Sequence, residues 1–308
     1  MNGFEGLRLP LMCAPMSFAS SIDLSVACCK AGVIGGWQGG TYTPIDQFEA
    51  YLDALANLEG ALPIVNLPAR ITSETDGPAK LDLLAKHRVP LVLSSVGDPS
   101  LLVERVHDWG GKLIHDVTTM RHAEKALAAG ADGLMLTCAG AGGHTGFLTP
   151  FAFVPAVRRT FDGLLIVAGG IADGHGIVAA LALGGDIACM GTRFIATPES
   201  GVVEGHRSMI PEAGIDEIVI SAAMNGVPAN WMKPSIEKVG LDYANLPQVR
   251  SRMPEGIMPW RDIWSAGQSV GLINDVTPAA ELIDQLAEEF ETAHVSRDWR
   301  EQLNSRLI

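Results

Sequence analysis

One histidine is surrounded by glycines within residues 130–146, which read GADGLMLTCAGAGGHTG. Imidazole changes its protonation state near neutral pH, so His144 is a candidate general base or acid. A histidine is more often structural than catalytic, but the glycines beside this one lack the side chains that would pack a structural ring. Gly142 and Gly143 also let the backbone lie against a flat ligand. The segment therefore predicts a functional His144 beside a planar group.

Two turns that follow apolar runs carry residues able to bind a phosphate group. Glycine exposes backbone N–H groups that approach phosphate oxygens closely, and a helix N-terminus at the same point adds partial positive charge. One glycine pair is usually just a tight turn, but two such turns on neighbouring strands predict a phosphate site. The expected residues are Gly169 and Gly170 in one turn, and Met190, Gly191 and Thr192 in the other. The next side chain, Arg193, either neutralises charge or faces the protein shell.

Side chains at the ends of other apolar runs are expected to contact the same ligand. Pro15 removes one backbone donor and fixes a turn in which Ala14 and Met16 can support a ring. Asn66 offers an amide that both donates to and accepts from a heterocycle. Asp116 can accept from a ring N–H or a hydroxyl, although a structural ion pair explains its position equally well.

Short apolar runs alternate with longer amphipathic stretches, which is typical of βα units and a parallel sheet. Most of these runs are continuously aliphatic, as expected where both faces of a strand are covered. Eight strands are expected, at 9–14, 33–36, 62–67, 89–94, 112–117, 133–137, 164–168 and 186–190. The pattern predicts an α/β protein with a (β/α)₈ TIM barrel, whose active site lies beyond the carboxyl ends of the strands. An open doubly wound sheet is the rival architecture.

The rhythm breaks after residue 200, which suggests three parts. Residues 1–200 form the barrel, residues 201–277 form an extension or insertion over its mouth, and residues 278–308 form a terminal helix. The middle part is rich in methionine, proline and tryptophan. If they were exposed, its large side chains would form an apolar patch, so a homodimer contact is the alternative; they are Trp231, Met232, Met258, Trp260 and Trp264.

Composition excludes several classes of partner. A net charge of −13 and the lack of a basic run argue against nucleic acid. The five cysteines lie in apolar segments without metal-binding spacing, as in a reducing cytoplasm. We expect a cytoplasmic protein, because the chain begins without a signal-peptide pattern and contains no membrane-spanning run. There is no Walker loop, and residues 140–146 misplace the last glycine of a Rossmann fingerprint.

Five segments taken together resemble the nitronate monooxygenase family, formerly called 2-nitropropane dioxygenases. They are APMS at 14–17, VNLP at 65–68, AGAGGHTG at 139–146, VAGGIADG at 167–174 and MGTRFIATPES at 190–200. The resemblance covers roughly residues 9–200 in the family's order. The histidine loop and the last segment are fairly specific in combination, whereas the GGI turn recurs in many FMN barrels.

The resemblance implies an FMN-dependent barrel that oxidises alkyl nitronates with O₂ to a carbonyl compound and nitrite. In this family His144 matches the base that removes the proton α to the nitro group of a neutral nitroalkane. The implied flavin contacts are Ala14, Met16 and Asn66, the loop beside the ring holds Gly142 and Gly143, and the phosphate site holds Gly169, Gly170, Gly191 and Thr192.

The chain departs from the family pattern at two strand ends. Thr137, followed by Cys138, stands where many members carry glutamine, and it is retained here as a candidate cofactor contact. His115 and Asp116 stand where others carry lysine, and His115 can reach the barrel mouth. Both changes touch flavin electronics or substrate shape. Residues 228–231 resemble a subgroup of the family and are candidates to cover the site.

Three other functions share these motifs. The nearest is an NADH-dependent FMN reductase of the same family, acting on enoyl-thioesters or quinones, with His144 as proton donor. A flavin-free phosphate-sugar isomerase or aldolase barrel would use the same phosphate turns. The third is a flavin-binding module without enzymatic activity.

Overall fold

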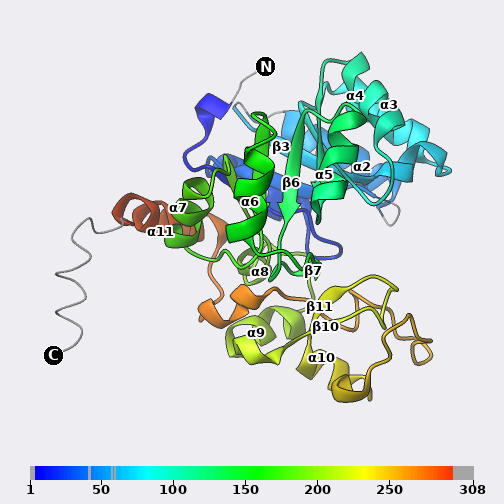
Figure 1. Ribbon diagram of the computed structural model, residues 1–308, viewed down its shortest axis with the longest axis vertical. Coiled ribbons are helices and arrows are strands. Elements are labelled where there is room, and N and C mark those ends of the chain that lie inside the picture. Colours follow the sequence, from blue (N-terminus) through cyan, green and yellow to red (C-terminus); the bar gives the residue numbers. More distant parts are fainter. Residues whose placement is uncertain (1–3, 41–42, 57, 59, 294–308) are drawn as a thin grey trace.

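Eight parallel strands form a closed barrel in the order β1-β2-β3-β4-β5-β6-β8-β9 (Figure 1). The computed structural model describes residues 4–293 except 41–42, 57 and 59. The strands are β1 Leu11–Cys13, β2 Ile34–Gln38, β3 Pro63–Pro68, β4 Leu91–Ser95, β5 Lys112–Val117, β6 Gly133–Thr137, β8 Leu164–Ala168 and β9 Ile187–Met190. The predicted TIM barrel is confirmed, and all eight strands lie where the sequence placed them.

A helix follows each of the first seven barrel strands. These helices are α1 Ile22–Lys30, α2 Ile45–Ala56, α3 Gly77–Lys86, α4 Ser100–Asp108, α5 Met120–Ala128, α6 Pro150–Arg158 and α7 Gly174–Ala182, with short 3₁₀ turns η1 Phe4–Gly6 and η2 Ala69–Ser73. Side-chain caps begin three of them: Ser21 accepts the N–H of Leu24, Thr119 that of His122, and Asp173 that of Gly176. At the end of α5, Gly130 turns the chain at φ +92°.

Strand side chains alternate between two cores. One set fills the barrel interior, with Met12, Ile34, Ile64, Leu93, Ile114, Met135, Ile166 and Cys189 among its members. The other set packs between the sheet and the surrounding helices, and includes Leu11, Val65, Leu113, Leu136 and Met190. Because the parity is fixed in every strand, it decides which strand-end side chains can face the mouth. All five cysteines are buried free thiols.

Residues 201–277 form an extension on one end of the barrel, seen below α8 in Figure 1. It contains α9 Glu204–Glu212, β10 Ile218–Ser221, β11 Ala229–Met232 and α10 Lys233–Lys238, with the 3₁₀ turns η3 Ile215–Glu217, η4 Tyr243–Asn245 and η5 Gln268–Leu272. The short strand β7 Gly143–His144, from the loop after β6, completes a three-stranded sheet in the order β10-β11-β7. The extension is thus hydrogen-bonded to the loop that carries His144.

Three of the large side chains that the sequence singled out in the extension pack inward. Trp231 and Met232 are fully buried, and Trp264 is 4% exposed. They belong to two small cores within and beneath the extension. The expectation that these residues would form an exposed dimer patch is therefore wrong for them, because the extension buries its own tryptophans; Met258 alone of the five is strongly exposed.

The ring of helices is closed by the end of the described chain. After β9 comes only the four-residue helix α8 Thr192–Ile195, and the extension separates it from α11 Ala279–Thr292. Helix α11 packs against α7 and α1 (Figure 1). Its residues Leu282, Ile283 and Leu286 join the core between helices and sheet. The barrel therefore includes α11, whereas the rest of the expected terminal helix, residues 294–308, lies outside the described residues. None of the described helices is long and apolar enough to cross a bilayer.

Candidate active site

His144 lies on the outer strand of the small sheet, at the barrel mouth. In this sheet His144 pairs with Ala229 of β11, and Gly143 pairs with Asn230. The ring Nε2 lies 2.9 Å from Nδ2 of Asn225, in the loop between β10 and β11. His144 is exposed at the surface of this loop, but the atoms packed around its ring still desolvate it. This desolvation lowers the pKa of His144 below its ordinary value, which favours the unprotonated ring at neutral pH. A neutral imidazole is the form that a general base requires.

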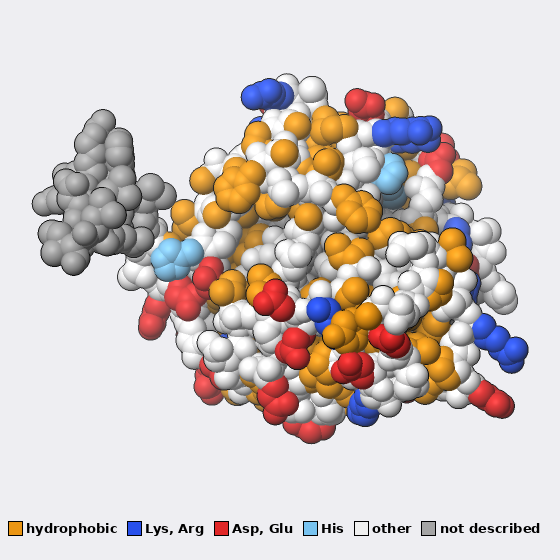
Figure 2. Space-filling view, turned by 60° about the horizontal axis from the view of Figure 1, so that its bottom comes forward, with side chains coloured by type: hydrophobic (Ala, Val, Ile, Leu, Met, Phe, Trp, Pro, Cys, Tyr) orange, Lys and Arg blue, Asp and Glu red, His pale blue; other side chains and the backbone are white. Residues whose placement is uncertain are grey.

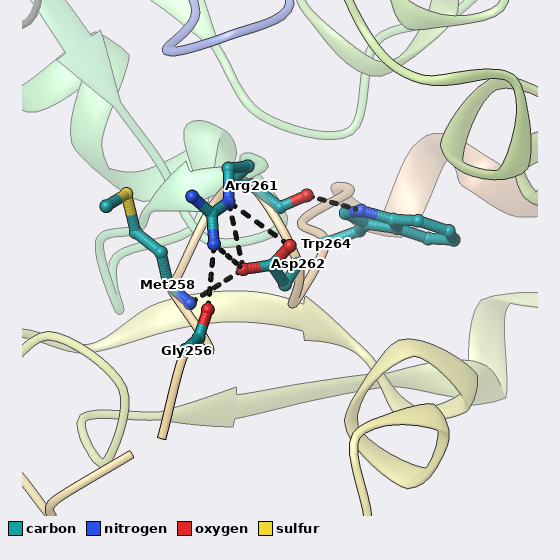
Figure 3. A network of polar contacts seen from close by, with 5 residues as sticks. All are labelled: Gly256, Met258, Arg261, Asp262 and Trp264. Carbon is teal, nitrogen blue, oxygen red and sulfur yellow. Dashed lines mark hydrogen bonds and ion pairs between the residues drawn. The ribbon is translucent and has the colours of Figure 1, made fainter. Parts of the chain in front are cut away.

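Two tryptophan side chains, Trp260 and Trp231, lie beside this imidazole. Trp260 meets the His144 ring edge to face, with ring centroids 5.4 Å apart, and lies against buried Trp231 at 4.2 Å. Trp260 has φ +73°, which is unusual for a bulky residue. The network in Figure 3 holds this turn, since Asp262 accepts from Arg261 and from the Met258 N–H while Arg261 also donates to the Gly256 carbonyl. Both tryptophans therefore belong to the extension.

A second segment of the extension clamps the histidine loop onto the barrel. Ser265 Oγ accepts the N–H of Gly143 at 2.7 Å and donates to the Asn230 carbonyl at 2.6 Å. Gly267 donates its N–H to Thr192 Oγ1 at 2.8 Å. A Cβ on Gly142 would lie 2.8 Å from the Gly267 nitrogen and 3.4 Å from Thr192 Oγ1. Residues 265–268 therefore link the histidine loop to the expected phosphate turn.

The glycine turns after β8 and β9 have the geometry of a phosphate cradle. Gly169 and Gly170 take φ +132° and +74°, which only glycine adopts readily. Within the described residues, the N–H groups of Gly170 and Thr192 donate to no acceptor, and a Cβ on Gly170 would meet nothing within 4 Å. Because Thr192 Oγ1 accepts from Gly267, its O–H remains available as a donor. These free donors beside open space suit a phosphate group.

The loop after β1 packs against the second of these turns. A Cβ on Gly191 would lie 3.3 Å from Met16 Sδ and 3.5 Å from Ala14 Cβ. Pro15 covers Gly36 of β2, where an added Cβ would lie 2.7 Å from the proline nitrogen. Ala14 and Met16 therefore lie beside Gly191, whereas Pro15 lies over Gly36. Their contact with a ligand stays a prediction.

Strand alternation sets the polar rim of the barrel interior. It points Asn66, Asp116 and Thr137 inward, and the Thr137 hydroxyl donates to Asp116 Oδ1 at 2.5 Å. The Asn66 amide donates to the Leu93 carbonyl at 3.2 Å and lies 3.4 Å from Ser95 Oγ. The same parity points Gln38 and Ser95 inward. Gln38 and Ser95 were not among the residues predicted for the site. Following the inward and outward alternation of side chains to the last residue of each strand would have found them.

Three side chains considered from the sequence turn away from the mouth. Met190 is fully buried in the outer core, so only its backbone can reach a ligand there. His115 also faces outward, with Nδ1 2.6 Å from Ser94 Oγ, and burial lowers its pKa to about 4; the expectation that it reaches the mouth is wrong. Arg193 pairs with Asp275 at 2.6 Å on the protein shell.

The family model for nitronate monooxygenase matches residues 63–289, which span most of the barrel and all of the extension. The chain belongs to the nitronate monooxygenase family. It is accordingly an enzyme of the oxidoreductase class.

Named relatives agree with this membership and show its breadth. A nitronate monooxygenase from Paraburkholderia phytofirmans is 27% identical and covers 93% of each chain. An octahydro-indene-carboxyl-CoA dehydrogenase from Mycobacterium tuberculosis is also 27% identical, over 75% of this chain and 65% of that protein. The structure of FabK from Thermotoga maritima has a TM-score of 0.79 at 27% identity, covering 98% of this chain and 97% of that one. The fold is shared with a nitroalkane oxidase from Streptomyces ansochromogenes, with a TM-score of 0.79, 24% identity, and 98% and 100% coverage.

Lys and Arg side chains form no patch on the face of this nitronate monooxygenase family member that Figure 2 shows. Acidic side chains gather over the lower half of that face, and Lys and Arg lie singly. Among the described residues, no group of three or more His, Cys, Asp or Glu side chains converges in a metal-binding arrangement.

Asp116 gives a pH-dependent stability that can be measured. Desolvation raises the pKa of its carboxyl from 3.8 to about 6, against the lowering effect of the Thr137 hydrogen bond. Between these two values the folded state holds more protons than the unfolded chain, so the free energy of unfolding falls as pH rises. The loss is at most about 3 kcal/mol, since one pKa unit corresponds to about 1.4 kcal/mol.

We expect Asp116→Asn to remove this loss. The melting temperature of the variant, relative to wild type, should rise between about pH 4 and pH 7. Asp98→Asn is the matched control: hydrogen bonds from Ser100 lower the pKa of Asp98 from its ordinary value of 3.8, so its pH effect lies below this value and the variant's difference from wild type should stay flat between pH 4 and pH 7. A difference between Asp116→Asn and wild type that is constant with pH would contradict the assignment.

Proposed function

We propose that this protein is an FMN-dependent monooxygenase that oxidises alkyl nitronates, and nitroalkanes after deprotonation, with O₂ to a carbonyl compound and nitrite. One observation carries the proposal: a neutral imidazole at the barrel mouth is tied by Ser265 and Gly267 to a turn with free phosphate donors. Its substrate is a small organic molecule. Family membership supports the reaction class.

The residues at the mouth suit FMN. Gly169, Gly170, Gly191 and Thr192 would hold the phosphate through N–H and O–H donors. Ala14, Met16, Gly142 and Gly143 would border the ring, while Asn66, Asp116 and Thr137 would offer polar contacts. When bound, the flavin would accept electrons from the nitronate and pass them to oxygen.

His144 acts on the substrate before any electron transfer. Its neutral ring takes the proton from the carbon α to the nitro group, and the negative charge moves to the nitro oxygens. The α C–H bond breaks as an N–H bond forms on the imidazole. Trp260 meets the ring edge to face, and desolvation lowers the pKa of the imidazole, which favours its neutral form. A preformed nitronate needs no such step.

An NADH-dependent reductase is the second candidate. The likeness to the enoyl reductase FabK, at 27% identity over nearly the whole chain, supports it, because the same barrel fold would serve either reaction. In that case His144 would donate a proton instead of removing one. The two functions differ in which molecule reduces the flavin.

Anaerobic mixing with NADH distinguishes them. We expect the visible flavin absorption to persist with NADH and to bleach promptly with propyl-2-nitronate, because the site is proposed to draw electrons from the nitronate. In air, propyl-2-nitronate should give rapid oxygen uptake with release of nitrite. Prompt bleaching by NADH, without nitronate-dependent oxygen uptake, would instead establish the reductase. Protein that takes up no FMN would contradict both functions and favour a flavin-free barrel.

A further inference from the structure

Asn225 is held in one orientation by its own turn. Its Oδ1 accepts the N–H of Val227 at 3.0 Å. The turn is closed by a hydrogen bond from the Gly226 N–H to the Ala222 carbonyl at 2.8 Å, with Gly226 at φ +91°. Rotating the side-chain amide would set its NH₂ against the Val227 N–H and lose that bond. The group that Asn225 presents to His144 is therefore its Nδ2.

This orientation determines the state of the histidine. An amide NH₂ group can only donate, so Nε2 of His144, 2.9 Å away, must be the acceptor. The neutral ring then carries its proton on Nδ1. Protonating Nε2 as well would bring two donors face to face, which opposes formation of the imidazolium while the amide stays in place.

No charged group among the described residues competes with this contact. Strands β7, β10 and β11 and the loop at 222–228 contain no titratable residue apart from His144. On the other packed segments, Arg250 lies over Gly226, and Arg261 and Asp262 follow Trp260 and pair with each other at 2.7 Å. Desolvation is the single cause that lowers the pKa of His144 within the described part of the chain.

We propose that Asn225 is a positioning residue: by donating to Nε2 it holds His144 as the neutral Nδ1–H tautomer until substrate displaces the amide. The Nε2 lone pair is then free to take the substrate proton, and that nitrogen gains the N–H bond as the α C–H bond breaks. The role in turnover rests on the proposed nitroalkane chemistry. The tautomer itself does not, so it can be measured separately.

The first test is an NMR titration of the holoenzyme with ¹⁵N-labelled histidine, with the His144 signals assigned through a His144→Asn variant. In wild type we expect the Nδ1–H tautomer. Asn225→Asp keeps an acceptor for the Val227 N–H but places a carboxylate at Nε2, so the pKa of His144 should rise by roughly 1–2 units. Asn274→Asp, an exposed position, adds the same charge elsewhere and should leave the pKa unchanged. An Nε2–H tautomer in wild type, or no rise in Asn225→Asp, would overturn the proposal.

The second test separates positioning from mere structural support. With a neutral nitroalkane, the acidic limb of the kcat/KM profile should move to higher pH by roughly 1–2 units in Asn225→Asp, following His144. With the preformed nitronate the two enzymes should show no such shift. Equal losses on both substrates without a shift would reduce Asn225 to a structural residue. Should neither substrate turn over in wild type, the proposed function fails while the NMR result still decides the tautomer.

Discussion

Replacing His144 with asparagine should lower kcat/KM for neutral nitroalkanes by about 10²–10⁴-fold, the range that general base catalysis contributes. The loss with preformed nitronates should be far smaller, because that substrate has already lost its α proton. FMN should remain bound, since the cradle at Gly169, Gly170 and Thr192 does not depend on the imidazole. Oxygen uptake with each substrate, and the visible spectrum of the purified variant, measure the three quantities.

The comparison between substrates makes this prediction specific. His107→Asn is the matched control, because His107 is an exposed residue of α4 that pairs with Asp132, at the amino-terminal end of β6 and away from the mouth. It should leave both rates near wild type. If His144→Asn loses the same factor on the nitroalkane and on the nitronate, His144 is not the base.

Substituting Gly267 with alanine should disrupt the site from outside the catalytic loop. The new Cβ would lie 2.5 Å from the Gly140 carbonyl oxygen and 2.8 Å from the Gly142 nitrogen. Both are backbone atoms, so no side-chain rotation relieves the clash. Residues 265–268 must then move away from the histidine loop, which breaks the bonds from Gly267 to Thr192 and from Gly143 to Ser265. We expect FMN affinity to fall at least about tenfold and stability by about 1–3 kcal/mol.

Backbone strain does not contribute to this effect, because Gly267 has φ −84°. Gly214→Ala is therefore a clean control: Gly214 has φ −83°, and its added Cβ would meet nothing within 4 Å. Flavin retained after dialysis and the melting temperature report the two losses. A Gly267→Ala variant that binds FMN as tightly as the Gly214→Ala variant would show that the clamp does not shape the cradle.

The barrel could be predicted from sequence because its signals are local. Each strand is a short aliphatic run covered on both faces, and caps such as Thr119 and Asp173 lie at the helix starts. The positions of Gly170 and His144 follow from the same rhythm. Alternation along each strand is a local signal too, and it is sufficient to separate inward Gln38 from outward Met190.

The extension was not predictable in the same way. Asn225, Trp260 and Gly267 reach the site only because β11 pairs with β7 and because residues 265–268 lie between two barrel loops. No periodic pattern marks such contacts, which join residues far apart in the chain: Gly267 and Thr192 are 75 positions apart, and Asn225 and His144 are 81. The tryptophans looked like a surface for a second subunit for the same reason, since their partners are distant in the chain.

The late position of α11 has a consequence for synthesis. A nascent chain that has completed β9 and the whole extension still lacks α11. This helix fills the gap between α7 and α1 with Leu282, Ile283 and Leu286. Until α11 is in place, the aliphatic side chains of α7 and α1 that it covers are exposed to water. The extension and the last helix of the barrel must consequently mature together, so the chain should acquire its activity only after residues 279–292 have been synthesised.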